Sequence, residues 1–195
     1  MSNRVKILTA STDCIAKFGI RGLRVNDVAK AAGVSSGLLY YHFTDRAGLL
    51  AATLDFINAR ASENETEHAA DASAELTPVH RLLLDEIQEN PEVRKNSVAW
   101  NELRSAAVFE ADIAQSLSHT VDRWNHTVAL AVSRLHDPDA TEPSAEALAV
   151  AEILTSLVEG ISGRWLSDAI SADHARALLT AAVTPLLSAS LATGV

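Results

Sequence analysis

Apolar residues recur at helical spacing along nearly the whole chain, three and four positions apart. Glycine, proline and capping residues interrupt this pattern and divide the 195 residues into about nine helical segments. The predicted segments are 4–18, 25–32, 36–43, 45–60, 78–89, 91–108, 112–135, 144–165 and 171–187. The apolar fraction of 48%, rich in alanine and leucine and with only 8 glycines, also favours an all-α protein over a sheet protein.

Two short segments meet at a tight turn near residue 33. In the first, Val28, Ala29 and Ala32 form one narrow apolar face, and Gly33 can take the positive φ that ends a helix. A serine two or three residues further on can cap the second segment, which makes the pair a helix-turn-helix. A second helix of about seven residues is too short to be stable alone, so packing against the rest of the domain must hold it. Its outer face is then expected to be available to a partner. The residues available for that face are small or hydrogen-bonding: Ser35, Ser36, Gly37, Tyr40, Tyr41 and His42.

The charge of the chain is divided unevenly. Residues 1–50 hold seven lysines and arginines against three acidic residues, a formal charge of +4. The remainder of the chain carries −13, which gives the net charge of −9. A phosphate responds to the local potential, because charges beyond about 8–10 Å are screened by salt. The amino-terminal part is therefore the part expected to bind nucleic acid.

The run DVAKAAGVSSGLLYYHFTDRAGLL from Asp27 to Leu50, preceded by ILTASTDCIAKFG ending at Gly19, resembles the DNA-binding domain of the TetR family of bacterial transcriptional regulators. The resemblance implies that the start of the third helix approaches base edges, while the tyrosines, the histidine and a basic residue hold phosphates. The family usually opens its second helix with threonine or serine, where this chain has Leu23 and Arg24. Arg24 or the backbone amides would then replace a lost phosphate contact. The expected DNA-binding residues are Arg24, Ser35, Ser36, Gly37, Tyr40, Tyr41, His42 and Arg46.

Two alternatives stay open for this segment. A helical bundle unrelated to nucleic acid could contain a turn of this kind by chance, although it leaves the tyrosine pair unexplained. Tyr40 could also pack against the following helix and expose only its hydroxyl group.

The resemblance implies a helix-turn-helix domain over 1–48 and a ligand-binding and dimerisation domain over 49–195. Within the second domain, the acidic, alanine-rich stretch 62–75 is expected to be a helix end plus a mobile connection. The last two helices are apolar over more than one face, so the surplus face is expected to meet a second copy. This is similar to the family's four-helix dimer bundle, with Gly160 and Gly163 allowing close approach. The alternative is a helix that is simply central to its own domain. The expected interface residues are Leu154, Leu157, Val158, Ile161, Leu178, Leu179, Ala182, Val183 and Leu186.

Three tryptophans fall in the helices that enclose the ligand cavity in this family. Polar residues follow the first of them, and a mostly apolar pocket with a few polar groups is how small-molecule sites are built. A small, partly apolar effector is therefore expected among Trp100, Asn101, Arg104, Phe109, Trp124 and Trp165, although each tryptophan could equally be core. The run LVEGISGRWL from Leu157 also looks like the carboxy-terminal domain of the branch that includes choline-responsive repressors, and it assigns no ligand.

The expected function is thus a ligand-responsive repressor that binds a palindromic double-stranded DNA operator as a homodimer. A helical enzyme or ligand carrier with a docking domain is the alternative. No glycine-rich phosphate loop, serine elbow or spaced cysteine set is present, so neither enzymatic activity nor a cofactor is expected. His119, Asp122 and His126 could face a common metal ion or form a solvated face. No signal peptide and no apolar run of about 18 residues occurs, which predicts a cytoplasmic protein without a membrane partner.

Overall fold

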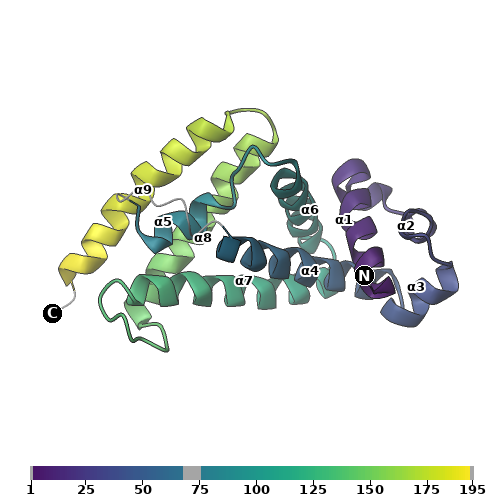
Figure 1. Cartoon of the computed structure of the whole chain (residues 1–195), viewed down its shortest axis with the longest axis horizontal. Coiled ribbons are helices and arrows are strands. Elements are labelled where there is room, and N and C mark those ends of the chain that lie inside the picture. Colours follow the sequence, from purple (N-terminus) through teal and green to yellow (C-terminus); the bar gives the residue numbers. More distant parts are fainter. Residues whose placement is uncertain (1, 68–75, 194–195) are drawn as a thin grey trace. The chain divides into compact units, whose positions relative to one another are not determined.

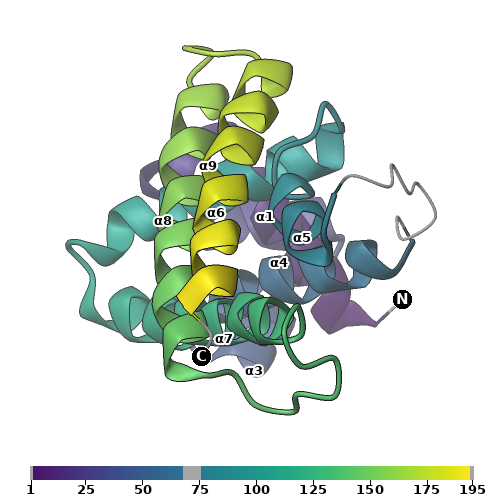
Figure 2. The same cartoon turned by 90° about the vertical axis from the view of Figure 1, so that its left-hand side faces the viewer.

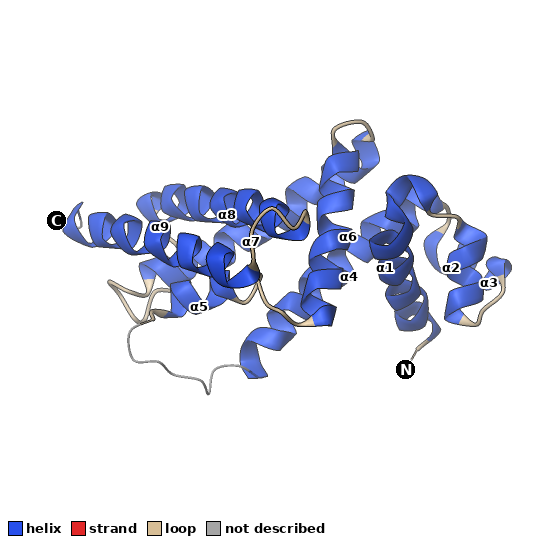
Figure 3. Ribbon diagram, turned by 90° about the horizontal axis from the view of Figure 1, so that it is seen from above, coloured by secondary structure: helices blue, strands red, loops and turns tan. Residues whose placement is uncertain are grey.

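The computed structural model describes residues 2–67 and 76–193, and within these ranges the chain forms nine helices and no strand (Figure 1). Short loops and turns join the helices (Figure 3). The prediction of an all-α protein with about nine helices is confirmed. The helices are α1 (Asn3–Gly22), α2 (Val25–Ala32), α3 (Ser36–Phe43), α4 (Arg46–Glu67), α5 (Pro78–Leu84), α6 (Pro91–Ala107), α7 (Ala111–Ser133), α8 (Ala145–Leu166) and α9 (Ala172–Thr193).

The helix ends differ most from the prediction in α4, α5 and α9. α4 continues to Glu67, so only residues 68–75 of the expected connection remain, and these lie outside the described residues. α5 ends at Leu84 because the guanidinium group of Arg176 donates hydrogen bonds to the carbonyl oxygens of Leu84 and Ile87, at 2.6 and 2.9 Å. α9 runs past Pro185, which lacks only one backbone donor.

The chain divides into two compact units. Unit 1 comprises residues 1–63 and 91–120, and unit 2 comprises 64–90 and 121–195. The predicted boundary between residues 48 and 49 falls within α4, and α6 packs with the helix-turn-helix rather than with the carboxy-terminal helices. Unit 1 is therefore larger than the predicted helix-turn-helix domain, and the division of the chain by function stays a prediction.

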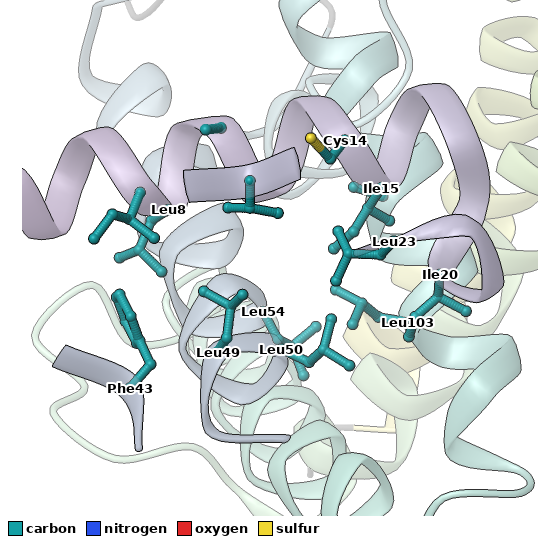
Figure 4. Close-up of a cluster of buried hydrophobic side chains, with 14 of the residues drawn as sticks. Leu8, Cys14, Ile15, Ile20, Leu23, Phe43, Leu49, Leu50, Leu54 and Leu103 are labelled. Atoms are coloured by element: carbon teal, nitrogen blue, oxygen red, sulfur yellow. The ribbon is translucent and has the colours of Figure 1, made fainter. Parts of the chain in front are cut away.

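The core of unit 1 gathers side chains from α1, α2, α3, α4, α6 and the start of α7, several of which are labelled in Figure 4. Apolar burial of this kind stabilises a fold by about 1.5–3 kcal/mol for each fully buried leucine or isoleucine, so the core fixes helices that are short. Its largest fully buried members are Ile7, Leu8, Ile15, Leu39, Leu49, Leu50, Leu54, Leu103 and Ile113.

In unit 2, α8 and α9 pack side by side (Figure 2), and α5 packs against both. The buried ring of His80 joins α5 to α9, because its Nδ1 lies 2.8 Å from the Thr77 hydroxyl and its Nε2 lies 3.2 Å from the Thr184 hydroxyl. Burial lowers the pKa of His80, so the ring is neutral at pH 7 and one nitrogen donates while the other accepts. None of the helices in the described ranges is both long and apolar enough to cross a bilayer.

Candidate nucleic-acid interface

The turn between α2 and α3 is built by backbone hydrogen bonds. Gly33 lies in the left-handed region with φ of 68°, and its N–H donates to Lys30 O at 3.2 Å while that of Val34 donates to Ala29 O at 3.0 Å. The hydroxyl of Ser35 then accepts a hydrogen bond from Leu38 N at 3.1 Å. Ser35 is therefore the N-cap of α3, and a helix-turn-helix is present as the sequence predicts.

α3 is anchored from behind and open in front. Leu39 and Phe43 are buried in the core of unit 1, and the guanidinium group of Arg4 lies 5.6 Å from the Phe43 ring centre. On the outer side, Tyr41 is 82% exposed and Gly37 is exposed as well. A Cβ atom at Gly37 would meet only the Ser35 hydroxyl, at 3.9 Å, so the surface beside the two serines is open. The helix thus presents its polar face to solvent.

The aromatic side chains at the end of α3 differ in exposure. The rings of Tyr41 and His42 contact each other edge to face with centroids 5.4 Å apart, and His42 is half-buried. This contact restricts the direction in which the Tyr41 hydroxyl can point. Tyr40 is 46% exposed, which leaves room for both of the roles expected for it.

Arg46 makes two side-chain contacts within unit 1. Its Nη2 donates to the carbonyl oxygen of Ile20 at 2.9 Å, and its Nη1 donates to the Glu110 carboxylate at 3.3 Å. The side chain keeps 38% exposure, and the expected phosphate contact stays a prediction. Arg24, in contrast, is exposed at the start of α2, where it makes no side-chain cap.

α6 fixes the bend at the end of α1. Gly19 has φ of 68° and ψ of 166°, so the helical hydrogen-bond pattern is broken there, as the sequence predicts. The freed N–H of Ile20 donates to the Glu102 carboxylate at 2.9 Å. A Cβ atom at Gly19 would lie 2.9 Å from the same carboxylate oxygen, so both space and backbone angle require glycine. Glu102 and Glu110 were not among the predicted site residues.

Salt bridges of Lys95 also join α1 to α6, closer to the amino-terminal ends of the two helices. Lys95 Nζ lies 2.9 Å from the Asp13 carboxylate and 2.7 Å from that of Glu92. Burial alone would lower the pKa of Lys95, but its hydrogen bonds to Asp13 and Glu92 outweigh that effect and raise it. The pairs 13–95 and 20–102 are both separated by 82 residues, so α1 and α6 run in the same direction along each other.

The start of α4 is also fixed by side chains. The Asp45 carboxylate accepts from Gly48 N at 2.8 Å, so Asp45 caps α4. Thr44 instead has a positive φ of 55° and caps the carboxyl end of α3. A Cβ atom at Gly48 would lie 2.6 Å from Phe43 O, so only glycine lets α3 and α4 meet this closely.

The predicted effector residues are divided between the units. Trp100, Asn101, Arg104 and Phe109 belong to unit 1, whereas Trp124 and Trp165 belong to unit 2. Phe109 lies beyond the end of α6 and is 80% exposed, and its contact with an effector stays a prediction. Trp165 is buried in the core of unit 2, which favours the packing alternative. Asn101 accepts from Arg104 at 3.0 Å, and Trp100 and Trp124 are half-buried.

The predicted dimer residues also separate into two groups. Leu154, Val158, Leu179 and Val183 are buried against their own chain and leave no surface for a partner, so these four are corrected to core residues. The pattern could not distinguish them, because both faces of these helices are apolar. Surface remains at Leu157, Ile161, Leu178, Ala182 and Leu186, and at Ile153, which was not predicted. No described residue fills the space beside Gly160 or Gly163.

His119, Asp122 and His126 are exposed along α7. His126 Nε2 lies 3.9 Å from the Glu142 carboxylate. Within the described part of the chain, no three histidine, cysteine or acidic side chains are grouped so that they could hold a metal ion. Their exposure agrees with the alternative that these three residues form a solvated face of the helix.

Two family models match the chain. Residues 7–53 match the model for bacterial regulatory proteins of the tetR family, and residues 74–188 match the model for the carboxy-terminal part of BetI-type transcriptional repressors. The HTH-type transcriptional regulator ArpR of Pseudomonas putida is 30% identical over 174 residues, which are 84% of this chain and 80% of ArpR. BetI of Yersinia pestis (strain Pestoides F) is 23% identical over 181 residues, 88% of this chain and 83% of BetI.

Solved structures share the fold. A TetR-family transcriptional regulator from Rhodococcus sp. matches with a TM-score of 0.84 and 46% identity, over 96% of this chain and 100% of its own. A transcriptional regulator from Saccharomonospora viridis, solved in complex with choline, matches with a TM-score of 0.71 and 21% identity, over 91% and 93% of the two chains.

Replacing Arg46 by alanine tests its position within unit 1. We expect a thermal midpoint lower by about 2–6 °C, because the change leaves Glu110 and the Ile20 carbonyl without their donor, worth about 1–2 kcal/mol when discounted for partial exposure. Circular dichroism at a fixed protein concentration measures it. Arg24→Ala, which removes an exposed arginine, should shift the midpoint by less than about 1 °C. Equal shifts in the two variants would contradict the assignment.

Proposed function

The chain belongs to the TetR family of bacterial regulatory proteins, and we propose that it represses transcription by binding a palindromic operator as a homodimer until a small effector releases it. It is a transcriptional regulator and not an enzyme, because the relatives and structural neighbours described above are regulators. The alternative of a helical enzyme or ligand carrier is therefore set aside. A regulator of bacterial operators acts in the cytoplasm, which is where we place it.

The observation that carries operator binding is the outer face of α3. The Tyr41 ring contacts the His42 ring but is 82% exposed, so it adds little to the packing of the fold and is free to contact DNA when α3 lies in a major groove. In this proposal Ser36 and Gly37 lie next to base edges, and Tyr40, Tyr41, His42 and Arg24 contact phosphates. The basic side chains exposed on unit 1 supply the attractive potential: Arg4, Lys6, Lys17, Arg21, Arg24 and Lys30.

Two changes on α3 test operator binding. Tyr41→Ala should weaken binding to every duplex by about 1–3 kcal/mol at low salt, because it removes a phosphate contact and its ring packing. Gly37→Leu should abolish binding, because a branched side chain would stand between the helix and the groove. Fluorescence anisotropy with a duplex selected from a random library measures both.

Phe109→Ala is the matched control, because it removes an aromatic ring of similar exposure from another turn of unit 1. Its affinity should stay within about twofold of the unmodified protein. Full affinity in both α3 variants would show that α3 is not the reading helix.

Dimerisation is proposed because two reading helices must be held at a fixed separation to match a two-fold operator. The free apolar surface of α8 recurs at Ile153, Leu157 and Gly160, which is helical spacing for one stripe. On α9, Leu178, Ala182 and Leu186 form a similar stripe. Glycine without a neighbour above it permits close helix approach, and the two stripes would form a four-helix bundle with those of a second copy.

Leu157→Glu and Leu178→Glu should give folded monomers, because each places a charge in the proposed interface while leaving the core of unit 2 intact. Sedimentation velocity at micromolar concentration measures the mass, and circular dichroism checks the fold. Val108→Glu, at a position 75% exposed in unit 1, should remain a dimer. A monomeric unmodified protein, or dimers in both leucine variants, would contradict the proposed interface.

The effector is proposed to be small and partly apolar, and Trp100, Asn101, Arg104 and Trp124 remain candidates to contact it. The match of residues 74–188 to BetI-type repressors and the choline bound by the Saccharomonospora viridis regulator support a search among quaternary ammonium compounds. Aromatic faces attract such cations. α4 and α7 each contain residues of both units, so they are the elements through which binding would reach α3.

Choline and a panel of small metabolites should be screened by tryptophan fluorescence, and each hit then added to an operator titration. A true effector should quench fluorescence and weaken operator binding at least tenfold, about 1.4 kcal/mol of differential affinity between the two conformations. Trp124→Phe should reduce the quenching, whereas Trp165→Phe should not. Hits that quench without changing operator affinity would contradict the proposed coupling.

A further inference from the structure

A side-chain hydrogen bond crosses from α2 to α3 on the exposed surface of the helix-turn-helix. The Ser36 hydroxyl donates to Asn26 Oδ1 at 2.9 Å. Ser36 is the first residue of α3, and Asn26 is the second residue of α2. Apolar packing of Val28, Ala29 and Leu39 already holds these helices together, so an exposed hydrogen bond adds little to the fold.

The hydrogen bond determines whether the Ser36 hydroxyl can act as a donor or an acceptor towards another partner. A serine hydroxyl has one O–H donor and two lone pairs, and it normally rotates so that it can contact either kind of base edge. At Ser36 the single O–H points at Asn26, so only lone pairs remain for another partner. The neighbouring Ser35 has the opposite arrangement, because its oxygen accepts from Leu38 N at 3.1 Å and its O–H stays free to donate.

We propose that Asn26 is a specificity-determining residue that makes Ser36 a hydrogen-bond acceptor towards the operator. In the major groove the donors are the amino groups of adenine N6 and cytosine N4, whereas guanine N7 and O6 and thymine O4 are acceptors. Ser36 therefore selects adenine or cytosine at the base it faces and disfavours guanine and thymine. Gly37 leaves the space beside Ser36 open, so a base edge can approach it. This inference rests on the proposed operator binding by α3.

The test is selection from a random duplex library with the full-length protein, followed by sequencing. Ser36→Ala identifies the base pair that Ser36 faces, because preference is lost there and kept elsewhere. At that pair, removing the major-groove amino group of adenine N6 or cytosine N4 should weaken binding of the unmodified protein by roughly three- to tenfold, the effect of one net hydrogen bond. Asn26→Ala frees the hydroxyl to rotate, so the preference should fall to within about twofold at this pair only.

Asn26→Asp is the conservative variant, because its carboxylate still accepts the Ser36 O–H. It should keep the base preference while total affinity falls through repulsion from phosphates, an outcome that a merely structural role would not give. Lys30→Ala, exposed on the same helix, is the control, and it should change affinity without changing the preference.

Two outcomes overturn the inference and leave the proposed function standing. One is an Asn26→Ala protein that keeps the full preference, and the other is unchanged affinity for an operator from which the major-groove amino group of the Ser36 pair, adenine N6 or cytosine N4, has been removed. An unmodified protein that selects no sequence from the library would overturn the proposed function itself, and this inference with it.

Discussion

An eight-residue helix is not stable by itself in water, and the position of α3 therefore depends on burying Leu39 and Phe43 behind it. Each such burial stabilises the fold by about 1.5–3 kcal/mol, which is enough to hold a short helix that would not form by itself. The core that receives them is made by α1, α4 and α6 as well as by α2 (Figure 4). The small, open and hydrogen-bonding outer face is possible only because the inner face supplies all of the anchoring.

The polar contacts of unit 1 converge on the bend that ends α1. Glu102 accepts from the Ile20 N–H, and Arg46 donates to the carbonyl oxygen of the same residue while pairing with Glu110. The backbone N–H and C=O groups of Ile20 thus both form hydrogen bonds with side chains, from α6 and α4 respectively. This makes α6 part of the reading unit, so any change in α6 or in the turn after it acts on the support of α3 directly.

Local signals in the sequence predicted much of this structure. They could not predict contacts between residues that are far apart in the sequence. Gly33 and the serines that follow it act within a few residues, so the pattern located the turn and the start of α3. Arg46 and Glu110 are 64 residues apart, and Ile20 and Glu102 are 82 apart, so no periodicity could pair them. On α8 and α9 the spacing showed two apolar faces but not which of them packs inside, which is why Leu154 and Leu157 were placed together.

Amide hydrogen exchange with and without operator DNA tests the central claim, that unit 1 supports α3 from behind so that its outer face alone meets the DNA. The account predicts added protection on addition of the operator over residues 24–43, with the amides of α6 already protected in the free protein by packing against α1. A duplex of unrelated sequence at the same concentration should give much weaker protection. Protection that falls instead on α8 and α9, or unprotected amides through α6 in the free protein, would contradict it.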